Sequence, residues 1–311
     1  IRYTPLGPNP LYGEAEEEAP GLLPNREFNR HPVPGPDGVF RFVAYPGPGL
    51  LVVILQGNAG RYLPRPIDPA DIAKARGDMH MEWAKLFGMY RLIDPKEGDK
   101  PLAVDIELDP GRKATGSLLG PDGKPVSGAT AYGLGAMPYG LNRPDLLLPG
   151  VSLKADTFTA SVLDPERPRT VSFVHKERRL IGRVELRGDE KGPVTVPMEP
   201  WGVLTGRLVD GDGKPIAGVR LGWHYPSVTA PGLPRPVEPF TTDAEGRFRV
   251  EGLAPGVKFE ITLSGGAKKG TAFSAGEGLK GLSLEPGQTK DLGDVRVKVA
   301  PAKKAEGGSD E

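Results

Sequence analysis

The sequence predicts an all-β protein made of β-sandwiches in tandem, because two patterns run through it. Short alternating apolar segments are separated by turns rich in glycine and proline. In addition, one stretch of the chain recurs ninety positions later: residues 116–128 read GSLLGPDGKPVSG and residues 206–218 read GRLVDGDGKPIAG. A fixed period with matching apolar positions indicates duplicated structural units.

The repeat stays in register downstream of these glycine-rich segments. Four apolar or proline positions keep the offset, pairing Phe158 with Phe248, Leu163 with Leu253, Pro165 with Pro255 and Val171 with Ile261. About seven short strands within roughly 100 residues are typical of a sandwich. The pattern therefore predicts one sandwich at 109–198 and another at 199–299.

Composition and charge exclude several classes of function. Forty basic and forty acidic residues cancel, so the charge gives no case for binding nucleic acid or an anionic membrane. The chain contains no cysteine, which excludes disulfides, thiol nucleophiles and thiolate metal ligands. No run approaches the roughly 18 apolar residues of a membrane-spanning helix. The 311 residues are enough for about two to three domains.

Residues 1–108 are predicted to form a partial sandwich. Segment 35–42 matches the Gly-x-Phe-x-apolar stretch of the last unit, 50–55 matches the strand after the Pro-Gly turn, and 102–108 matches the closing strand. The strand pair that carries Gly-Lys-Pro has no counterpart here. The sequence starts at Ile1 without an initiator Met or a leader, so we expect that strand pair to precede Ile1. We expect residues 1–34 to form a long loop.

A short helical insertion is predicted near 68–90 of this first unit. Asp68 followed by Pro69 is typical of a helix start. Apolar residues then recur at helical spacing, at Ile72, Ala75, Met79, Trp83, Leu86 and Phe87. The stripe is expected to pack on the sheet; a groove for a ligand or partner is the alternative.

The linkers between the units are short, and the chain ends in a polar tail. Pro-containing segments at 108–111 and 198–201 lead directly from a closing strand into the next opening strand. Short joints of this kind make semi-rigid arrays. Residues 300–311 have no apolar periodicity and are predicted to be disordered.

The repeated segments carry a family resemblance. The pattern Gly-x-Leu-x-x-x-Asp-Gly-Lys-Pro, followed by Gly-x-Phe-x-apolar-x-Gly-Leu-x-Pro-Gly, resembles the carboxypeptidase regulatory-like repeat, which is similar to the transthyretin-like (prealbumin-like) domain. The match is best at 206–263 and good at 116–128. The resemblance implies seven-stranded Greek-key sandwiches without catalytic residues of their own. It also implies an exported or cell-envelope protein.

Most groups of polar residues in the sequence are expected to lie in turns or on the protein surface and not in a binding site. The four histidines, His31, His80, His175 and His224, show no metal-ligand spacing. Residues 210–213 read DGDG but lack the remaining ligands of a calcium loop, so a hairpin turn is expected. The basic stretch at 167–179 is interrupted by acidic residues and is expected to be a solvated face. The closing strands contain no Asn for an intramolecular Lys–Asn bond.

Aromatic residues after the second strand of each unit are the tentative ligand contacts. They are Trp223 and Tyr225 in the last unit and Tyr132 and Tyr139 in the middle one. If they lie on loops at the end of a sandwich, they would bind a glycan or peptide. The alternative is that they only pack against other residues of these loops. An iron site built on His224 and Tyr225 lacks the other ligands that it needs.

Taken together, the residues and the family resemblance favour a non-catalytic array that acts as a spacer or binding scaffold in a larger bacterial protein, with no cofactor and no metal. Two other roles stay open. One is an accessory region of an enzyme or regulator whose catalytic domain lies upstream. The other is a carbohydrate- or peptide-binding module that uses the aromatic loops. The expected partner is a protein, peptide or glycan.

Overall fold

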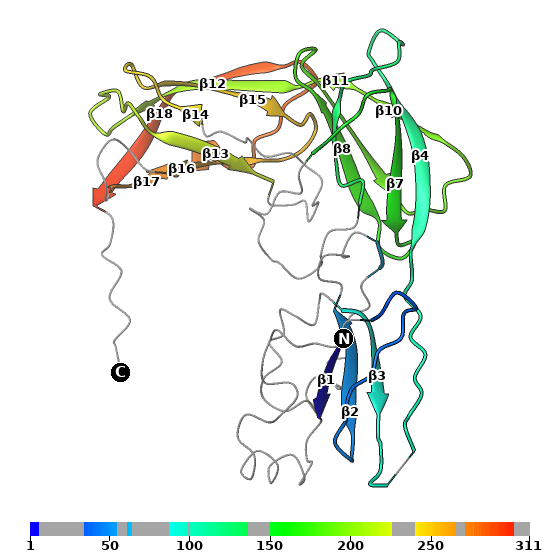
Figure 1. Cartoon of the computed structure of the whole chain (residues 1–311). Coiled ribbons are helices and arrows are strands. Elements are labelled where there is room, and N and C mark those ends of the chain that lie inside the picture. Colours follow the sequence, from blue (N-terminus) through cyan, green and yellow to red (C-terminus); the bar gives the residue numbers. More distant parts are fainter. Residues whose placement is uncertain are drawn as a thin grey trace.

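The computed structural model describes residues 1–5, 34–54, 61–63, 87–98, 100–135, 150–225, 240–264, 271–275 and 277–301. These residues are all-β apart from one 3-10 turn, η1 (Glu277–Leu279). Their strands form a three-stranded N-terminal sheet, a middle sandwich and a C-terminal sandwich, which follow one another along the chain (Figure 1). No helix in these ranges is long and apolar enough to cross a membrane.

The middle sandwich packs a sheet of order β10-β4-β7 against a sheet of order β11-β9-β8-β5-β6. Its core contains the rings of Phe158 and Phe173, whose centroids lie 4.7 Å apart. The strands are β4 (Arg112–Leu119), β5 (Thr130–Tyr132), β6 (Val151–Ser152), β7 (Thr157–Leu163), β8 (Arg169–His175), β9 (Leu180–Leu186), β10 (Val194–Pro197) and β11 (Glu199–Pro200).

The C-terminal sandwich repeats this arrangement with sheets of order β15-β12-β18-β17 and β14-β13-β16. Its strands are β12 (Gly202–Val209), β13 (Arg220–His224), β14 (Phe240–Thr241), β15 (Arg247–Leu253), β16 (Glu260–Ser264), β17 (Thr271–Ala275) and β18 (Thr289–Pro301). In both sandwiches the closing strand runs parallel to the central strand, and the strand that carries the core Phe runs antiparallel to it. The predicted tandem sandwiches are confirmed.

An aromatic ring lies against a glycine of the central strand in each sandwich. Gly116 is opposite Phe158 in β7, and Gly206 is opposite Phe248 in β15. A Cβ atom at Gly116 would lie 2.5 Å from Phe158 Cζ, and one at Gly206 would lie 2.7 Å from Phe248 Cζ. Both rings are almost fully buried, at 4 % exposure. Glycine is therefore needed at these positions because the ring occupies the side-chain space.

Aspartate side chains close the turns that the sequence predicts. Asp210 Oδ1 accepts the backbone N–H groups of Asp212 and Lys214, each at 2.9 Å. Asp243 Oδ1 in the same way accepts the N–H groups of Glu245 and Arg247, at 3.1 and 2.7 Å. These are the Asx turns expected of such residues. The carboxylate of Asp210 is thus used within its hairpin turn.

The two sandwiches differ in the turn before the core Phe. In the C-terminal sandwich Thr242 is buried, and its Oγ1 accepts the N–H of Val219 at 3.0 Å and donates to the carbonyl of Ile216 at 2.8 Å. Leu153 takes this position in the middle sandwich, since its backbone bonds Gly128 and Ala129 as the backbone of Thr242 bonds Gly218 and Val219. A hydrogen-bonded hydroxyl is therefore replaced by a buried apolar side chain, and the following turn is one residue shorter.

The N-terminal sheet has the order β1-β2-β3 and is antiparallel throughout, with β1 (Arg2–Pro5), β2 (Gly49–Ile54) and β3 (Phe87–Ile93). Its core is Tyr3, Leu51 and Ile93. Tyr3 Oη donates to the carbonyl of Tyr45 at 3.2 Å, and burial raises the pKa of Tyr3 to about 12.

Four expectations for the ends and the first unit need correction. Residues 2–5 form strand β1, because they complete an antiparallel pair with β2, so the predicted loop at 1–34 is wrong there. Phe87 begins β3, so the predicted helix does not reach 90; residues 64–86 lie outside the described residues. Segment 102–108 is extended but is not paired as a strand. β18 extends to Pro301, and the remainder of the predicted tail lies outside the described residues.

The ring-over-glycine contact makes Gly116→Ala destabilising. The added Cβ would also meet the carbonyl oxygen of Val194 at 2.5 Å, so we expect a loss of about 1–3 kcal/mol in the middle sandwich. Hydrogen exchange in peptides from β4, β7 and β10 measures it. Gly192→Ala is the matched control, since its Cβ meets no atom within 4 Å. Equal exchange in the two variants would contradict the steric explanation.

The buried hydroxyl of Thr242 predicts a second effect. Thr242→Val keeps the shape but leaves the Val219 N–H without its acceptor, which costs about 1–3 kcal/mol. Thr242→Ser keeps the hydroxyl and should cost less. Chemical unfolding monitored at Trp223 measures the difference. A Val variant as stable as the Ser variant would show that the hydroxyl contributes nothing.

Candidate functional site: the joint between the two sandwiches

Two of the four predicted ligand aromatics lie in the core of the C-terminal sandwich. Trp223 is 6 % exposed and Tyr225 is 9 % exposed, and both belong to its main apolar cluster. Trp223 is in β13 and Tyr225 directly follows that strand. Tyr132 is partly buried, and Tyr139 lies outside the described residues. The rings of Trp223 and Tyr225 therefore face protein and not solvent.

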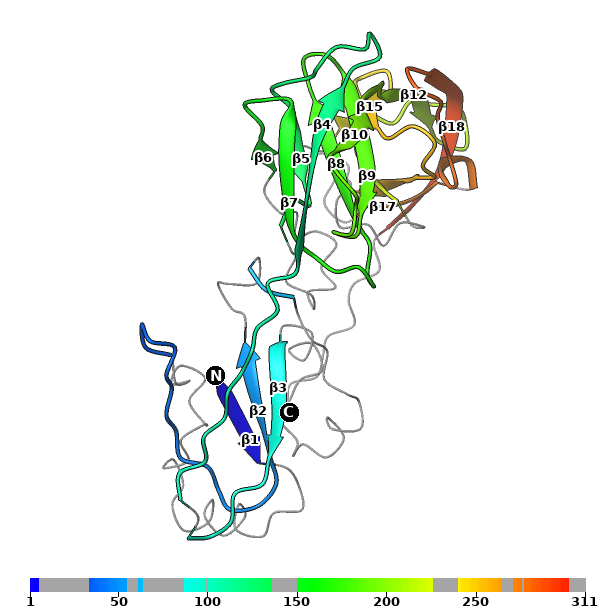
Figure 2. The same ribbon diagram turned by 90° about the vertical axis from the view of Figure 1, so that its right-hand side faces the viewer.

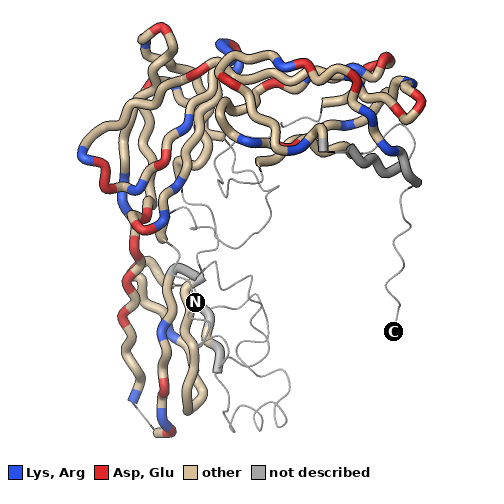
Figure 3. Tube along the Cα trace, turned by 180° about the vertical axis from the view of Figure 1, so that it is seen from behind, with Lys and Arg blue, Asp and Glu red and all other residues tan. Residues whose placement is uncertain are grey.

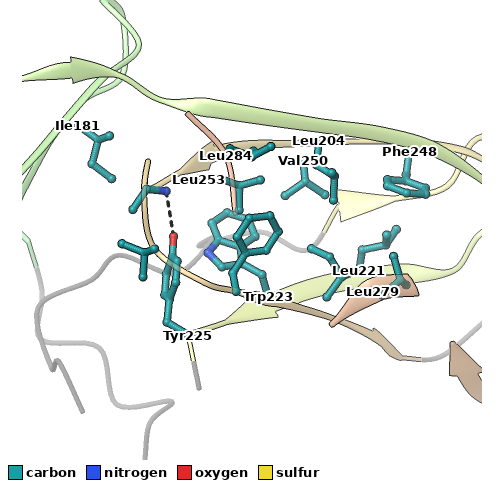
Figure 4. Close-up of a cluster of buried hydrophobic side chains, with 14 of the residues drawn as sticks. Ile181, Leu204, Leu221, Trp223, Tyr225, Phe248, Val250, Leu253, Leu279 and Leu284 are labelled. Carbon is teal, nitrogen blue, oxygen red and sulfur yellow. Dashed lines mark hydrogen bonds between the residues drawn. The ribbon is translucent and has the colours of Figure 1, made fainter. Parts of the chain in front are cut away.

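The hydroxyl group of Tyr225 is tied to the following Pro-Gly turn. Tyr225 Oη accepts the backbone N–H of Ala254 at 3.2 Å, and the indole of Trp223 lies beside it (Figure 4). Burial raises the pKa of Tyr225, although the hydrogen bond from Ala254 opposes the rise. The neutral phenol is therefore the form that the folded protein holds.

The same cluster crosses from one sandwich to the other. Val174 in β8 and Ile181 in β9 of the middle sandwich are members of the C-terminal core cluster, and Tyr132 in β5 packs against it. Ile181 lies above Tyr225 in Figure 4. Because the two sandwiches bury apolar residues against each other here, the joint has a core of its own.

Backbone hydrogen bonds reinforce the joint. Residues 199–200 pair with β9 as the short strand β11, so the linker becomes part of the middle sandwich. The Trp201 N–H then donates to the Arg179 carbonyl at 3.0 Å, and the Gly287 N–H donates to the Pro200 carbonyl at 2.9 Å. The linker is therefore bonded on both sides, which leaves little freedom for a hinge.

A small cavity lies at the joint and is lined by Arg183, Glu199, Pro255 and their neighbours. Its volume is about 140 Å³. Sites for small molecules usually measure about 300–1,000 Å³. Its size thus suits a packing gap between two domains better than a ligand pocket.

A second joint connects the first unit to the middle sandwich. Leu63 and Val162 form a buried pair, and the Leu63 N–H donates to the Asp109 carbonyl at 2.7 Å. Val162 has a positive φ of 55°, which is costly for a β-branched residue. The buried guanidinium of Arg169 donates to the carbonyls of Ser161 and Val162 and supports this turn. Arg169 thus departs from the solvated face expected of its basic stretch.

The charged residues do not concentrate into one binding face. Acidic and basic residues are interspersed over the described surface, with many of them in turns (Figure 3). Within the described ranges no three His, Cys, Asp or Glu side chains come close enough to hold a metal ion. Asp122 has a lowered pKa because its carboxylate accepts the Lys124 N–H at 3.2 Å, which is again a turn contact.

The sequence contained a signal for this joint. Leu221, Trp223 and Tyr225 alternate with Gly222 and His224, which is the period of a half-buried strand. That alternation would have placed both aromatics on the inner face. The partners Val174 and Ile181 were not identified because only the fold brings them to Tyr225.

Comparisons with known proteins give structural likenesses only. No family model matches the sequence, and no curated protein matches it. The structure is similar to a streptococcal ancillary pilin, with 18 % identity over 67 % of this chain and 69 % of that one and a TM-score of 0.27. It is also similar to the shaft pilin SpaA of Lactobacillus rhamnosus GG (13 %, 62 % and 98 %, TM-score 0.25). The Bacillus anthracis TIE protein matches at 12 %, 60 % and 34 %, with a TM-score of 0.23.

These matches span different shares of the other proteins, from about a third of TIE to nearly all of SpaA.

Removing the Tyr225 hydroxyl should loosen the joint. Tyr225→Phe leaves the buried N–H of Ala254 unpaired, and we expect a loss of about 1–3 kcal/mol. Hydrogen exchange in 253–261 and in β9 would rise. Tyr132→Phe keeps its ring at the same joint and should change exchange little. If both variants behave alike, the Tyr225 hydrogen bond does not hold the joint.

Proposed function

We propose that this chain is a non-catalytic array of carboxypeptidase regulatory-like sandwiches that serves as a spacer or binding scaffold in a larger bacterial protein. The joint between the middle and C-terminal sandwiches is the observation that carries the proposal. It combines a shared apolar cluster with hydrogen bonds on both sides of the linker. Domains move relative to one another by default, and an apolar, bonded interface restrains that motion.

We also infer that the chain consists of three units, at 1–108, 109–198 and 199–299. The second and third units, which are the two sandwiches, are copies of one repeat. The paired contacts of Gly116 with Phe158 and Gly206 with Phe248 support this inference. So does the parallel closing strand in each copy. The short strand at 199–200 then belongs to the third unit in sequence while it extends the sheet of the second.

The burial of Trp223 and Tyr225 favours a role in the joint over contact with a glycan or peptide. A stacking platform for a sugar needs an open ring face, and both rings are enclosed by core residues. We therefore assign Trp223, Tyr225 and Tyr132 to the joint. Tyr139 stays a tentative ligand contact, on a segment outside the described residues.

A distance measurement between the two sandwiches tests the spacer role. The chain has no native cysteine, so spin labels at Lys154→Cys and Lys214→Cys report one distance, and both positions are exposed. We expect a single narrow distribution, because the joint is bonded and packed. The pair Lys113→Cys and Lys154→Cys, within the middle sandwich, gives the width of a rigid body.

Adding Tyr225→Ala should broaden the distribution between sandwiches and leave the control pair unchanged. A broad distribution already present without that substitution would contradict the rigid spacer. Turnover of a hydrolase or oxygenase substrate by residues 1–311 alone would contradict the non-catalytic role.

A further inference from the structure

The first strand of the middle sandwich lies beside its closing strand, and both run in the same direction. β10 pairs parallel with β4, and the register runs from Val194 opposite Gly116 to Pro197 opposite Leu119. The Met198 N–H extends this pair, since it donates to the Leu119 carbonyl at 2.7 Å. The chain therefore enters β4 at one end of the sheet and leaves β10 at the other end.

The C-terminal sandwich has the same arrangement with a longer strand pair. β18 runs parallel to β12, and the register extends from Thr289 opposite Val203 to Arg296 opposite Val209. In each sandwich the two strands lie side by side in both views (Figures 1 and 2). The chain thus enters and leaves both sandwiches through a pair of parallel, hydrogen-bonded strands.

This topology determines how tension along the chain would act on each sandwich. A pull on the chain from both sides draws β4 and β10 along their length in opposite directions, and it does the same to β12 and β18. The hydrogen bonds of a parallel pair are evenly spaced along the strands, so this pull loads them together and in shear. Resistance to forced unfolding depends on the unfolding barrier, which is high when several bonds must break at once.

Side chains on the closing strands add to this resistance. Val196 of β10 and Val297 of β18 belong to the two cores and are 0 % and 3 % exposed. A slip of one residue in register would turn these side chains out of the core. Across the second pair Arg207 Nη1 lies 3.4 Å from Asp294 Oδ1. Sliding of the strands would therefore disrupt packing together with the backbone bonds.

We propose that the middle and C-terminal sandwiches are tension-bearing units, in which the parallel pairs β4–β10 and β12–β18 act as mechanical clamps when the chain is stretched. This function goes beyond that of a spacer, which only has to hold a distance. It rests on the topology within each sandwich and not on the joint between them. A flexible joint would leave both clamps intact, so the spacer role and the clamps can fail separately.

Stretching single molecules of the full 311-residue chain in two directions tests the clamp of the middle sandwich. The chain has no cysteine, so DNA handles for optical tweezers can be attached through pairs of engineered cysteines. Lys113→Cys with Glu199→Cys pulls β4 and β10 in opposite directions along their length. Lys113→Cys with Glu166→Cys instead pulls β4 and β7 apart at the end where Arg112 is opposite Leu163, so these antiparallel strands separate one residue pair after another. All three handle positions are exposed.

We expect the shear variant to rupture at a force at least about twofold higher than the second variant at the same loading rate, because its bonds break together. The variants share Lys113→Cys and differ only in which exposed glutamate carries the other handle. Chemical unfolding should therefore give the same midpoint for both, and the force difference then reports the direction of the pull.

The same comparison applies to the C-terminal sandwich. Glu199→Cys with Lys298→Cys loads β12 and β18 in shear, and Glu199→Cys with Lys258→Cys separates β12 from β15 one residue pair after another. Lys298 and Lys258 are both exposed. Equal rupture forces in the two directions, or a lower force in shear, would overturn the proposal.

Discussion

The contact between a phenyl ring and a backbone glycine organises both sandwiches. Phe158 and Phe248 reach across from the neighbouring strand and fill the space that a side chain at Gly116 or Gly206 would take. The ring thereby fixes the register of the central strand, and a slip of one residue would turn its apolar side chains away from the core. The central strand in turn holds the closing strand, which runs parallel to it and leads directly into the next unit. The position of the joint between the two sandwiches therefore depends on this contact in the middle sandwich.

The two sandwiches differ at a position where the middle one contacts its neighbour. Val162 and Gly252 occupy equivalent positions, and both have positive φ, 55° and 79°. Glycine adopts this conformation at little cost, whereas valine is strained there. Strain of this kind persists only where the surroundings over-determine it. At Val162 the surroundings are the Arg169 guanidinium and the side chain of Leu63 from the preceding unit. The middle sandwich thus has, where the C-terminal sandwich has Gly252, a residue that packs against the preceding unit.

Most of the fold was predictable because it is encoded locally. Turn residues such as Asp210 and Asp243, and the glycines opposite the core Phe, act within one hairpin or one strand pair. The joint was not predictable, because Tyr225 meets Ile181 only after two sandwiches have folded and docked. Strand β17 was also missed, since residues 271–275 follow a segment rich in Gly and Lys that gives no strand signal. The helical spacing of apolar residues up to Phe87 led to a helix prediction that was wrong at its C-terminal end. Strand β3 begins at Phe87, where pairing with β2 determines the conformation.

The connection between the first unit and the middle sandwich is held by contacts from both sides. Segment 102–108 continues through Asp109 and Gly111 into β4. Asp109 Oδ1 accepts the Gly111 N–H at 2.8 Å, while its carbonyl accepts Leu63, so the connection is bonded from both units. Leu63 also packs against Val162 in β7, the strand whose Phe158 lies against Gly116. The strand that carries the ring-and-glycine contact of the middle sandwich therefore also carries the residue that meets the preceding unit.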